Sequence, residues 1–323
     1  MLSRVANSIY WMARYVERAE NIARFLGVTI NCSLDHPDSG IAQWEPLVRA
    51  TGDEAYFREH YGDFTPASVL QFLSFDREYH SSILTSISRA RENARTVREA
   101  ISSEAWEQLN TLYHEVKEAS RSAADSCHAD FYDNTIQQCY KMTGIMEATM
   151  SRGTAWHFAN IGRFLERADK TSRILDVKYF TLHRRLRDVD TPLDDLLWSA
   201  VLWSTCSFEM YRKRYHALDV ERIVDFLVLD RKFPRAMKFS VQQVRNSLSE
   251  IAGPVEERHN EVVRKADELL DCFARTTASS IIDQGLHEFT DSLQQSLNVI
   301  GEKVYETYFA SPAMPVLQRQ ASV

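Results

Sequence analysis

Glycine and proline are scarce in this chain, which has 10 glycines and 8 prolines among its 323 residues. Soluble proteins hold about twice that share on average. The scarcity excludes collagen-like and low-complexity classes. It also argues against a β-sandwich or barrel, which needs a turn about every 8–12 residues. Because no convincing strand pattern is present, we expect an all-α protein of long helices joined by few turns.

The chain also lacks an excess of basic residues, a long apolar run and any close pair of cysteines. Its net charge of −7 provides no overall basic field for nucleic acid. No stretch approaches the roughly 18 uncharged apolar residues of a membrane span, and the first residues show no apolar signal core. The five cysteines are dispersed, as expected for reduced thiols: Cys32, Cys127, Cys139, Cys206 and Cys272. These absences predict a soluble cytoplasmic protein that binds neither nucleic acid nor membrane.

The most informative feature present is an internal repeat. The segment RYVERAENIARFL at 14–26 recurs as RFLERADKTSRIL at 163–175. Further along, QFLSFDREY at 71–79 matches DFLVLDRKF at 225–233. Chance is a poor explanation for matches that keep their order and nearly their spacing, so we predict an internal duplication.

The repeat predicts how the chain is divided. Two copies of one fold usually pack about a pseudo-twofold axis, as the subunits of a homodimer do. We therefore expect two related helical bundles, a first half at 1–152 and a second half at 153–309. Residues 310–323 contain two prolines and no period, so we expect a disordered tail there.

The opening segment carries an apolar seam with the period of a packed helix. Its residues alternate at spacings of four and three: Val5, Ile9, Met12, Val16, Ala19, Ala23, Leu26 and Ile30. Further along, Thr65 and Pro66 are typical of the N-cap and first position of a short helix. Three later prolines are expected to open helices, which run from Pro192 to about Tyr215, from Pro234 to Ile251 and from Pro254 to about Thr276.

Opposite this seam, the first helix presents a charged stripe that also holds aromatic residues. Its pattern R-x-x-E-R recurs in the second copy. Glu17 is within reach of Arg14 at i−3 and of Asn21 at i+4. Arginine suits recognition of carboxylate or phosphate because its planar guanidinium forms two parallel hydrogen bonds. The candidate ligand-binding arginines are Arg14, Arg18, Arg24, Arg163, Arg167 and Arg173, and the candidate catalytic residues are Glu17 and Glu166.

Three interpretations of the charged stripe stay open. It is a solvated face with helix-stabilising ion pairs, a buried network that ties the two halves together, or a ligand site at their interface. Four arginines outnumber two glutamates in the two motifs, and a positive excess would suit a carboxylate, a phosphate or an acidic peptide. We predict one shared polar cleft in which the two motifs meet: Arg14, Glu17 and Arg18 with Arg163, Glu166 and Arg167.

A second charged pair also recurs. Asp76 and Arg77 in the first copy correspond to Asp230 and Arg231 in the second. A helix-end cap with an ion pair accounts for these residues, and as ligand-binding residues they would extend the polar interface. The chain has no H-E-x-x-H, no phosphate-binding glycine loop and no nucleophile elbow, so we predict neither a metal ion nor a cofactor.

Several motifs are shared with a known family. They are SRVANSIYWMARYVERAENIARFL at the start, R-F-L-E-R-A-D in the second copy, RENAR at 91–95 with WEQLN at 106–110, and F-P-R at 233–235. In these motifs the chain resembles the bacterial alpha-E family, which is helical and named for its glutamate and arginine signatures. The resemblance covers nearly the whole chain except the tail. The sequence departs from it at 79–83 and at Ala236, which bears on that loop rather than on the fold.

The resemblance implies a genomic setting beside a circularly permuted ATP-grasp ligase and a transglutaminase-like cysteine peptidase, hence peptide synthesis or modification. The first hypothesis is an accessory or substrate-binding component that works with this ATP-grasp ligase and recognises an acidic peptide or a phosphorylated small molecule. The second is an enzyme acting on an activated carboxylate, with Glu17 or Glu166 as general base. The third is a purely structural helical scaffold.

Overall fold

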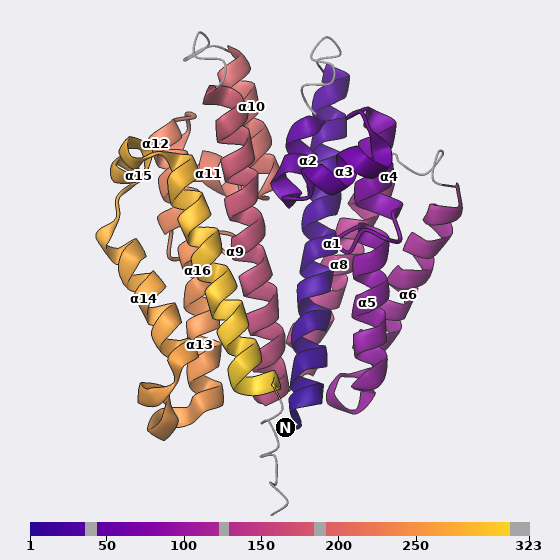
Figure 1. The fold of residues 1–323 in the computed structure, drawn as a ribbon, viewed down its shortest axis with the longest axis vertical. Helices are drawn as coiled ribbons and strands as arrows, with labels where there is room; N and C mark the ends of the chain where they lie inside the picture. The colour runs from indigo at the N-terminus through magenta and orange to yellow at the C-terminus, as the bar shows by residue number, and fades with distance from the viewer. Residues whose placement is uncertain (36–43, 123–128, 184–191, 311–323) are drawn as a thin grey trace, which may run out of the picture.

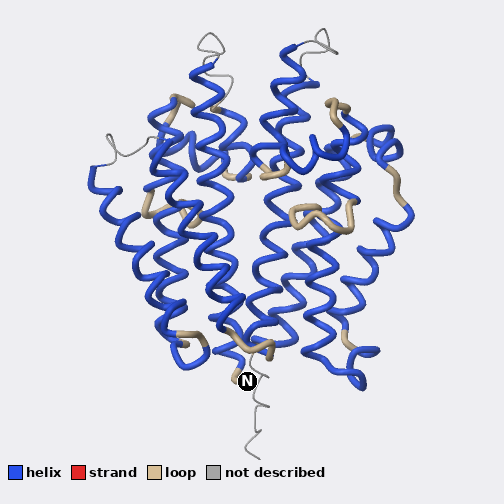
Figure 2. The backbone as a smooth tube through the Cα atoms, turned by 180° about the vertical axis from the view of Figure 1, so that it is seen from behind, coloured by secondary structure: helices blue, strands red, loops and turns tan. Residues whose placement is uncertain are grey.

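Helices make up every regular element in the part of the chain that the structure describes. The computed structural model describes residues 1–35, 44–122, 129–183 and 192–310. Figure 2 shows no strand in these residues, so the all-α prediction is confirmed. Of the expected disordered tail, residues 311–323 lie outside the described ranges.

Two long helices form the centre of the molecule (Figure 1). They are α1 (Ser3–Asp35) and α9 (Thr154–His183), and they pack against each other. α1 is also covered by two helices of the first half, α5 and α8, and α9 by two of the second half, α13 and α16. The bounds of these helices are Ile83–Thr96 for α5, Ala129–Thr149 for α8, Met237–Glu256 for α13 and Leu286–Val304 for α16.

Shorter helices complete each side of the molecule. In the first half they are α2 (Glu45–Thr51), α3 (Glu54–Tyr61), α4 (Pro66–Phe75) and α6 (Ser103–Ala119). In the second half they are α10 (Pro192–Ser204), α11 (Phe208–Tyr215), α12 (Val220–Val224), α14 (Glu261–Arg275) and α15 (Ala278–Gln284). Figure 1 places α2 and α3 at the same end of the molecule as α10 to α12.

The apolar seam predicted for the first helix is buried. Ile9, Met12, Ala19, Ala23 and Leu26 are all inaccessible to solvent. Ile9 belongs to a hydrophobic cluster built mainly from the second half, whereas the other four belong to one built mainly from the first. The beginning of α1 therefore packs in the core of the opposite half. The division into two halves and its origin by duplication stay predictions from the sequence.

Some of the predicted helix starts are confirmed. Thr65 is the N-cap of α4, and its side chain and that of Ser68 form a capping box. Pro192 is the first residue of α10, but this helix ends at Ser204 instead of continuing through α11. The interruption coincides with Cys206, whose φ of 52° lies in the left-handed region.

The helix start predicted at Pro234 is wrong, because α13 begins three residues later. Gly253, with φ of 71°, interrupts the helical backbone just before Pro254, so a helical segment does begin there, but it does not continue to Thr276 as predicted. The next helix, α14, begins where the Asn260 side chain accepts the N–H groups of its first turn. The first N–H groups of a helix have no partner within the helix. A side chain that accepts them defines the start of a helix better than proline, which is only tolerated at that position.

The close approach of α1 and α9 depends on a glycine. A Cβ added at Gly162 would overlap the backbone carbonyl oxygen of Tyr10 and crowd the side chain of Arg14. Because glycine has no side chain, the two backbones come into direct contact at this point. One turn further along each helix, the charged stripes of α1 and α9 face each other.

Candidate functional site

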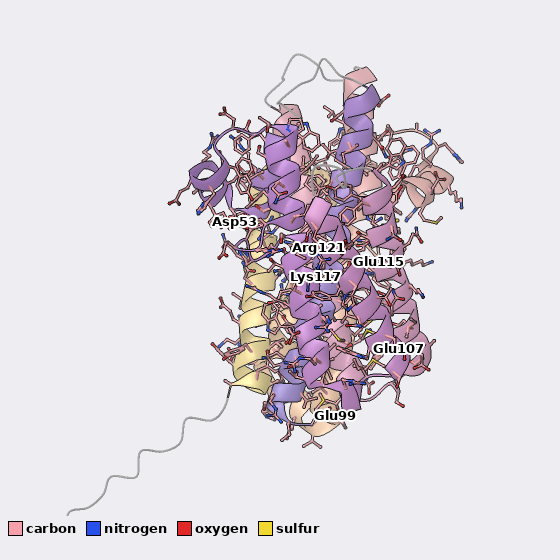
Figure 3. The ribbon with its side chains drawn as sticks, turned by 90° about the vertical axis from the view of Figure 1, so that its right-hand side faces the viewer. Asp53, Glu99, Glu107, Glu115, Lys117 and Arg121 are labelled. Atoms are coloured by element: carbon pink, nitrogen blue, oxygen red, sulfur yellow. The ribbon has the colours of Figure 1, made fainter. Side chains whose placement is uncertain are left out.

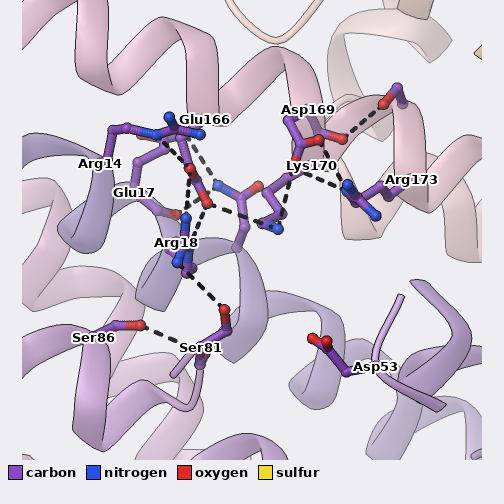
Figure 4. A network of polar contacts seen from close by, with 12 residues as sticks. Arg14, Glu17, Arg18, Asp53, Ser81, Ser86, Glu166, Asp169, Lys170 and Arg173 are labelled. Carbon is purple, nitrogen blue, oxygen red and sulfur yellow. Dashed lines mark hydrogen bonds and ion pairs between the residues drawn. The ribbon is translucent and has the colours of Figure 1, made fainter. Parts of the chain in front are cut away.

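Two glutamates exchange ion pairs across the contact between α1 and α9. Glu17 of α1 accepts hydrogen bonds from Nε and Nη2 of Arg167 on α9, at 2.7 and 2.8 Å. Glu166 of α9 accepts a bidentate pair from Arg18 of α1, at 2.6 and 3.1 Å. Arg14 donates a further bond to Glu166 at 2.9 Å (Figure 4). The two R-x-x-E-R motifs are thus in direct contact.

These carboxylates are inside the protein. The Glu166 side chain is 0% exposed and the Glu17 side chain 5%. Since α9, α5 and α8 all cover α1, its polar face is enclosed together with its apolar seam. The interpretation of the charged stripe as a solvated face is therefore wrong.

A third glutamate, Glu20, joins a distant loop to α1. Nη2 of Arg235, just before α13, donates to both carboxylate oxygens of Glu20, at 2.7 and 2.8 Å. Arg235 also donates to the side-chain oxygen of Asn21 at 3.0 Å, and Asn21 donates to Glu17 at 3.1 Å. Glu20 is also paired with Arg24 on the same helix. The i+4 contact expected between Glu17 and Asn21 is therefore present, and Glu20 forms another with Arg24 at the same spacing.

The network also continues along α9 beyond Glu166. Figure 4 shows Asp169, Lys170 and Arg173 following along α9. Nε of Arg173 bonds both oxygens of Asp169, at 2.9 and 3.0 Å. The Lys170 ammonium lies 3.2 Å from Asp169 and 3.7 Å from Glu166. Arg173 therefore lies at one end of the network, and Arg24 holds the corresponding place at the other end.

Arg163 pairs outside the two motifs. Its Nη2 donates to Glu147 of α8 and to Asn160, both at 2.8 Å, while its Nε has no hydrogen-bond partner. Beside it lies a cavity of about 30 Å³, lined in part by Glu17 and Trp156. A cavity of this size holds a single water. The space beside Glu17 therefore admits water rather than a peptide.

The arginines hold both central glutamates ionised. Burial opposes ionisation of Glu17, but neighbouring guanidinium groups, chiefly that of Arg167, lower its pKa to about 2. Burial likewise opposes ionisation of Glu166, but Arg18 and Arg14 hold its pKa well below the usual range of a carboxyl. A carboxylate of such low pKa is a weak proton acceptor near neutral pH. The geometry therefore favours the role of fixing the arginines in place.

Basic side chains outnumber acidic ones in this network. The basic members are Arg14, Arg18, Arg24, Arg163, Arg167, Lys170, Arg173 and Arg235, and the acidic members are Glu17, Glu20, Glu147, Glu166 and Asp169. Burial lowers the pKa of Arg24 and that of Arg163. A neighbouring arginine lowers each further, Arg235 for Arg24 and Arg167 for Arg163. Such a surplus attracts anions.

The second repeated charge pair lies outside this network. Asp76 follows α4, accepts two backbone N–H groups and binds the Tyr61 hydroxyl at 2.8 Å. Asp230 accepts two backbone N–H groups in the same way and pairs with Arg214. The arginines that follow these aspartates in the sequence, Arg77 and Arg231, are exposed. The interpretation of these aspartates as helix-end caps fits their positions. Among the described residues, no contact joins these charge pairs to the buried network, so they do not extend the polar interface.

Sequence reasoning did not select Arg235 or Glu147 as site residues. Arg235 belongs to the F-P-R motif, which was a usable signal, but its place opposite Glu20 depends on how this loop folds over α1. Glu147 carries no signal, because nothing around it in the sequence distinguishes it from the exposed acidic residues of other helices.

An all-helical protein with a buried arginine–glutamate network between two long helices is the class that this fold and site define. Residues 1–309 match the model of the Alpha-E family, described as a predicted alpha-helical domain with a conserved ER motif. The chain belongs to this family. Two Glu-Arg dipeptides of the chain, Glu17-Arg18 and Glu166-Arg167, contribute all four of their side chains to the network.

Among curated proteins, the chain is similar to uncharacterized proteins of Mycobacterium bovis and of two Mycobacterium tuberculosis strains, CDC 1551 and H37Rv. Each is 24% identical over 271 residues, which is 77% of this chain. The match spans only 30% of the length of each relative. No solved structure matches the chain.

Neither a membrane-spanning helix nor a metal cluster occurs within residues 1–35, 44–122, 129–183 and 192–310. No helix there combines the length and the apolar character needed to cross a bilayer. No three His, Cys, Asp or Glu side chains in these ranges come together in a group that could hold a metal ion.

Proposed function

We propose that this protein recognises an anion, the carboxylate or phosphate group of a peptide or small molecule, at the contact of α1 and α9. The observation that carries the proposal is the surplus of cations around Glu166. Four basic side chains lie there against the two carboxylates of Glu166 and Asp169: Arg14, Arg18, Lys170 and Arg173. Guanidinium and ammonium groups are the usual protein partners of both ligand groups.

Three of the four cations are more accessible than both of the carboxylates that they surround. The four basic side chains are 11–24% exposed, against 0% for Glu166 and 12% for Asp169. Ser81, which accepts a bond from Arg18 at 3.3 Å, and Asp53 face them (Figure 4). Even with Asp53 included, cations outnumber carboxylates by four to three. An incoming anion would therefore meet N–H donors first.

Glu17 and Glu166 act as positioning residues in this proposal. A buried carboxylate that receives two or three charge-assisted bonds fixes the rotamers of its arginines, so these need no reordering when a ligand binds. The alternative of an enzyme with Glu17 or Glu166 as general base has less support, because the low pKa of both carboxyls makes them poor proton acceptors.

We further propose that binding serves a partner enzyme, an ATP-grasp ligase, to which this protein presents an acidic peptide or a phosphorylated small molecule. The resemblance to the alpha-E family and its genomic setting support this role.

Anion binding is tested by isothermal titration with inorganic phosphate and with tri-glutamate. We compare the wild type with Lys170→Gln, which removes one partly exposed cation of the network. The control is Lys117→Gln on α6 (Figure 3), a lysine whose ammonium lies over the Tyr113 ring and is not a member of the network. Loss of one charge-assisted hydrogen bond weakens binding about tenfold or more. We expect this for Lys170→Gln and no change for Lys117→Gln.

The titration has a clear negative outcome. Absence of saturable binding of both probes to the wild type, or equal weakening in the two lysine variants, would contradict anion recognition at this site. Binding should also weaken with rising salt, because the interaction is between charges at a partly solvated site.

The partner proposal has a test of its own. The protein is purified together with an ATP-grasp ligase of the kind that the family resemblance implies, and peptide products are identified by mass spectrometry. We expect a complex, and we expect Lys170→Gln to lower product yield while leaving the complex intact. If no complex forms, or if the yield is unchanged, this protein does not present substrate to the ligase.

A further inference from the structure

Cys206 occupies a backbone position that disfavours a side chain. It lies between α10 and α11 with φ of 52°, and it is exposed. In the sequence repeat its counterpart is Gly52, which also has a positive φ, of 82°. Glycine adopts this conformation without steric cost, whereas a cysteine does not. The second copy thus carries a thiol where the first copy has none.

A single tyrosine lies between the thiol and a buried arginine. The Cys206 Sγ is 3.4 Å from the Tyr140 hydroxyl of α8, which in turn accepts a hydrogen bond from Nη2 of Arg24 at 3.1 Å. Because the Tyr140 oxygen already accepts from Arg24, its own proton is available to the sulfur. This arrangement stabilises a negatively charged sulfur rather than a neutral thiol.

Arg24 itself has unused capacity to bind an anion. Its residue is 7% exposed, and its Nε has no hydrogen-bond partner. Buried N–H donors are nearly always satisfied, so an orphan on a charged side chain indicates a missing acceptor. Glu20 is shared between Arg24 and Arg235 and therefore does not compensate both charges.

The surroundings of the thiol are cationic. Partial burial opposes thiolate formation, but the neighbouring groups outweigh it and lower the pKa of Cys206. These groups come from four elements: Arg24 of α1, Tyr140 of α8, Arg235 before α13 and Arg167 of α9. Partly exposed cysteines in such electropositive places are the reactive ones in proteins.

We propose that Cys206, with Tyr140 and Arg24, forms a nucleophilic site for electrophiles that carry a carboxylate or phosphate. The Cys206 thiolate attacks the electrophilic carbon and forms an S–C bond, and the leaving group departs with the electron pair of the bond that breaks. Arg24 attracts the anionic group of the electrophile. This site is separate from the cations around Glu166, so the inference does not rest on the proposed function.

Access to the sulfur is open on the outer side. Tyr140 is 39% exposed, and two large apolar side chains that flank Cys206 in the sequence, Trp203 and Met210, are 45% and 46% exposed. Small electrophiles can therefore reach the sulfur from solvent.

The test compares alkylation by iodoacetate, an anion, with alkylation by neutral iodoacetamide. In both reactions the thiolate displaces iodide from a CH₂ carbon. Peptide mapping by mass spectrometry gives the rate at each cysteine of the full-length protein, and exposed Cys272 is the internal reference. We expect the iodoacetate-to-iodoacetamide rate ratio at Cys206 to exceed that at Cys272 about fivefold, as one nearby charge in a largely aqueous setting provides.

Variants and salt identify the groups responsible. Arg24→Gln should reduce the ratio at Cys206 to that of Cys272, and Tyr140→Phe should move the pH midpoint of Cys206 alkylation upward. If Arg24→Gln does not fold, raising ionic strength to about 1 M should reduce the ratio in the wild type instead. Equal ratios at the two cysteines, or a Cys206 midpoint at about 8.5 or above as in an ordinary thiol, would overturn the proposal.

Discussion

Replacing Glu17 with glutamine tests whether the central ion pairs hold α1 and α9 together. Glutamine keeps the size of the side chain and removes its charge. In the wild type, Glu17 accepts two hydrogen bonds from Arg167, at 2.7 and 2.8 Å, and its side chain is 5% exposed. In Glu17→Gln the Arg167 guanidinium stays in the same buried place without its counter-ion.

Two independent estimates give the size of the effect. Removing one partner of a buried ion pair costs about 3–5 kcal/mol, because the other charge is left uncompensated. The pKa of Glu17 falls from 4.5 to about 2 in the folded protein, which corresponds to about 3 kcal/mol at pH 7. We therefore expect Glu17→Gln to lower the free energy of unfolding by about 3 kcal/mol.

The sign of the pH dependence follows from the direction of the shift. Because the folded-state pKa of Glu17 is depressed, its contribution is fully present above the unfolded value of 4.5 and is lost as pH falls toward about 2. The difference between wild type and Glu17→Gln should shrink to about 1 kcal/mol at pH 3, by linkage with these two pKa values.

Urea unfolding followed by circular dichroism measures this difference at pH 7 and at pH 3. The control is Glu107→Gln on the exposed face of α6 (Figure 3), where we expect a change within about 0.5 kcal/mol. A loss below about 1 kcal/mol at pH 7, or a loss that does not depend on pH, would refute the structural role of the pair.

Three further predictions concern α1, α9 and the cap of α14. Gly162→Ala should destabilise the protein by about 1–3 kcal/mol or more, because the added Cβ overlaps the backbone of Tyr10, and thermal unfolding measures the loss. Arg18→Lys should cost about 1–3 kcal/mol in urea unfolding, since an ammonium cannot reproduce the bidentate contact with Glu166; equal stability would argue against that geometry. Asn260→Ala should cost about 1 kcal/mol and raise amide hydrogen exchange in the first turn of α14, whose N–H groups the asparagine caps; unchanged exchange would contradict this.

Elements with a strong periodic pattern were predictable, whereas those defined by one local conformation were not. The seam of α1 repeats over about seven turns, and such a pattern has no stable alternative to a buried helix face. The break between α10 and α11 depends on one residue with left-handed backbone, Cys206. A cysteine in a sequence does not indicate a left-handed backbone, whereas a glycine does. The start of α14 depends on the Asn260 cap, which competed with the proline signal at Pro254.

The partners of the charged residues show the same limit. Glu17 was expected to meet Asn21 and Arg14 on its own helix. The contact with Asn21 is present, but Arg14 turns to Glu166 on α9 instead. Helical spacing restricts which side chains can touch within one helix, and it says nothing of which neighbour competes for them from outside.

By itself, the sequence determined that this protein is helical, that its first helix has one apolar and one charged face, and that the charged face recurs in the second long helix. Only the tertiary structure decided that both charged faces are buried against each other. The close contact at Gly162 brings α1 and α9 together so that their charged faces are buried, and buried carboxylates must then find cations. The choice of Arg18 for Glu166, of Arg167 for Glu17, and of Arg235 for Glu20 follows from that packing.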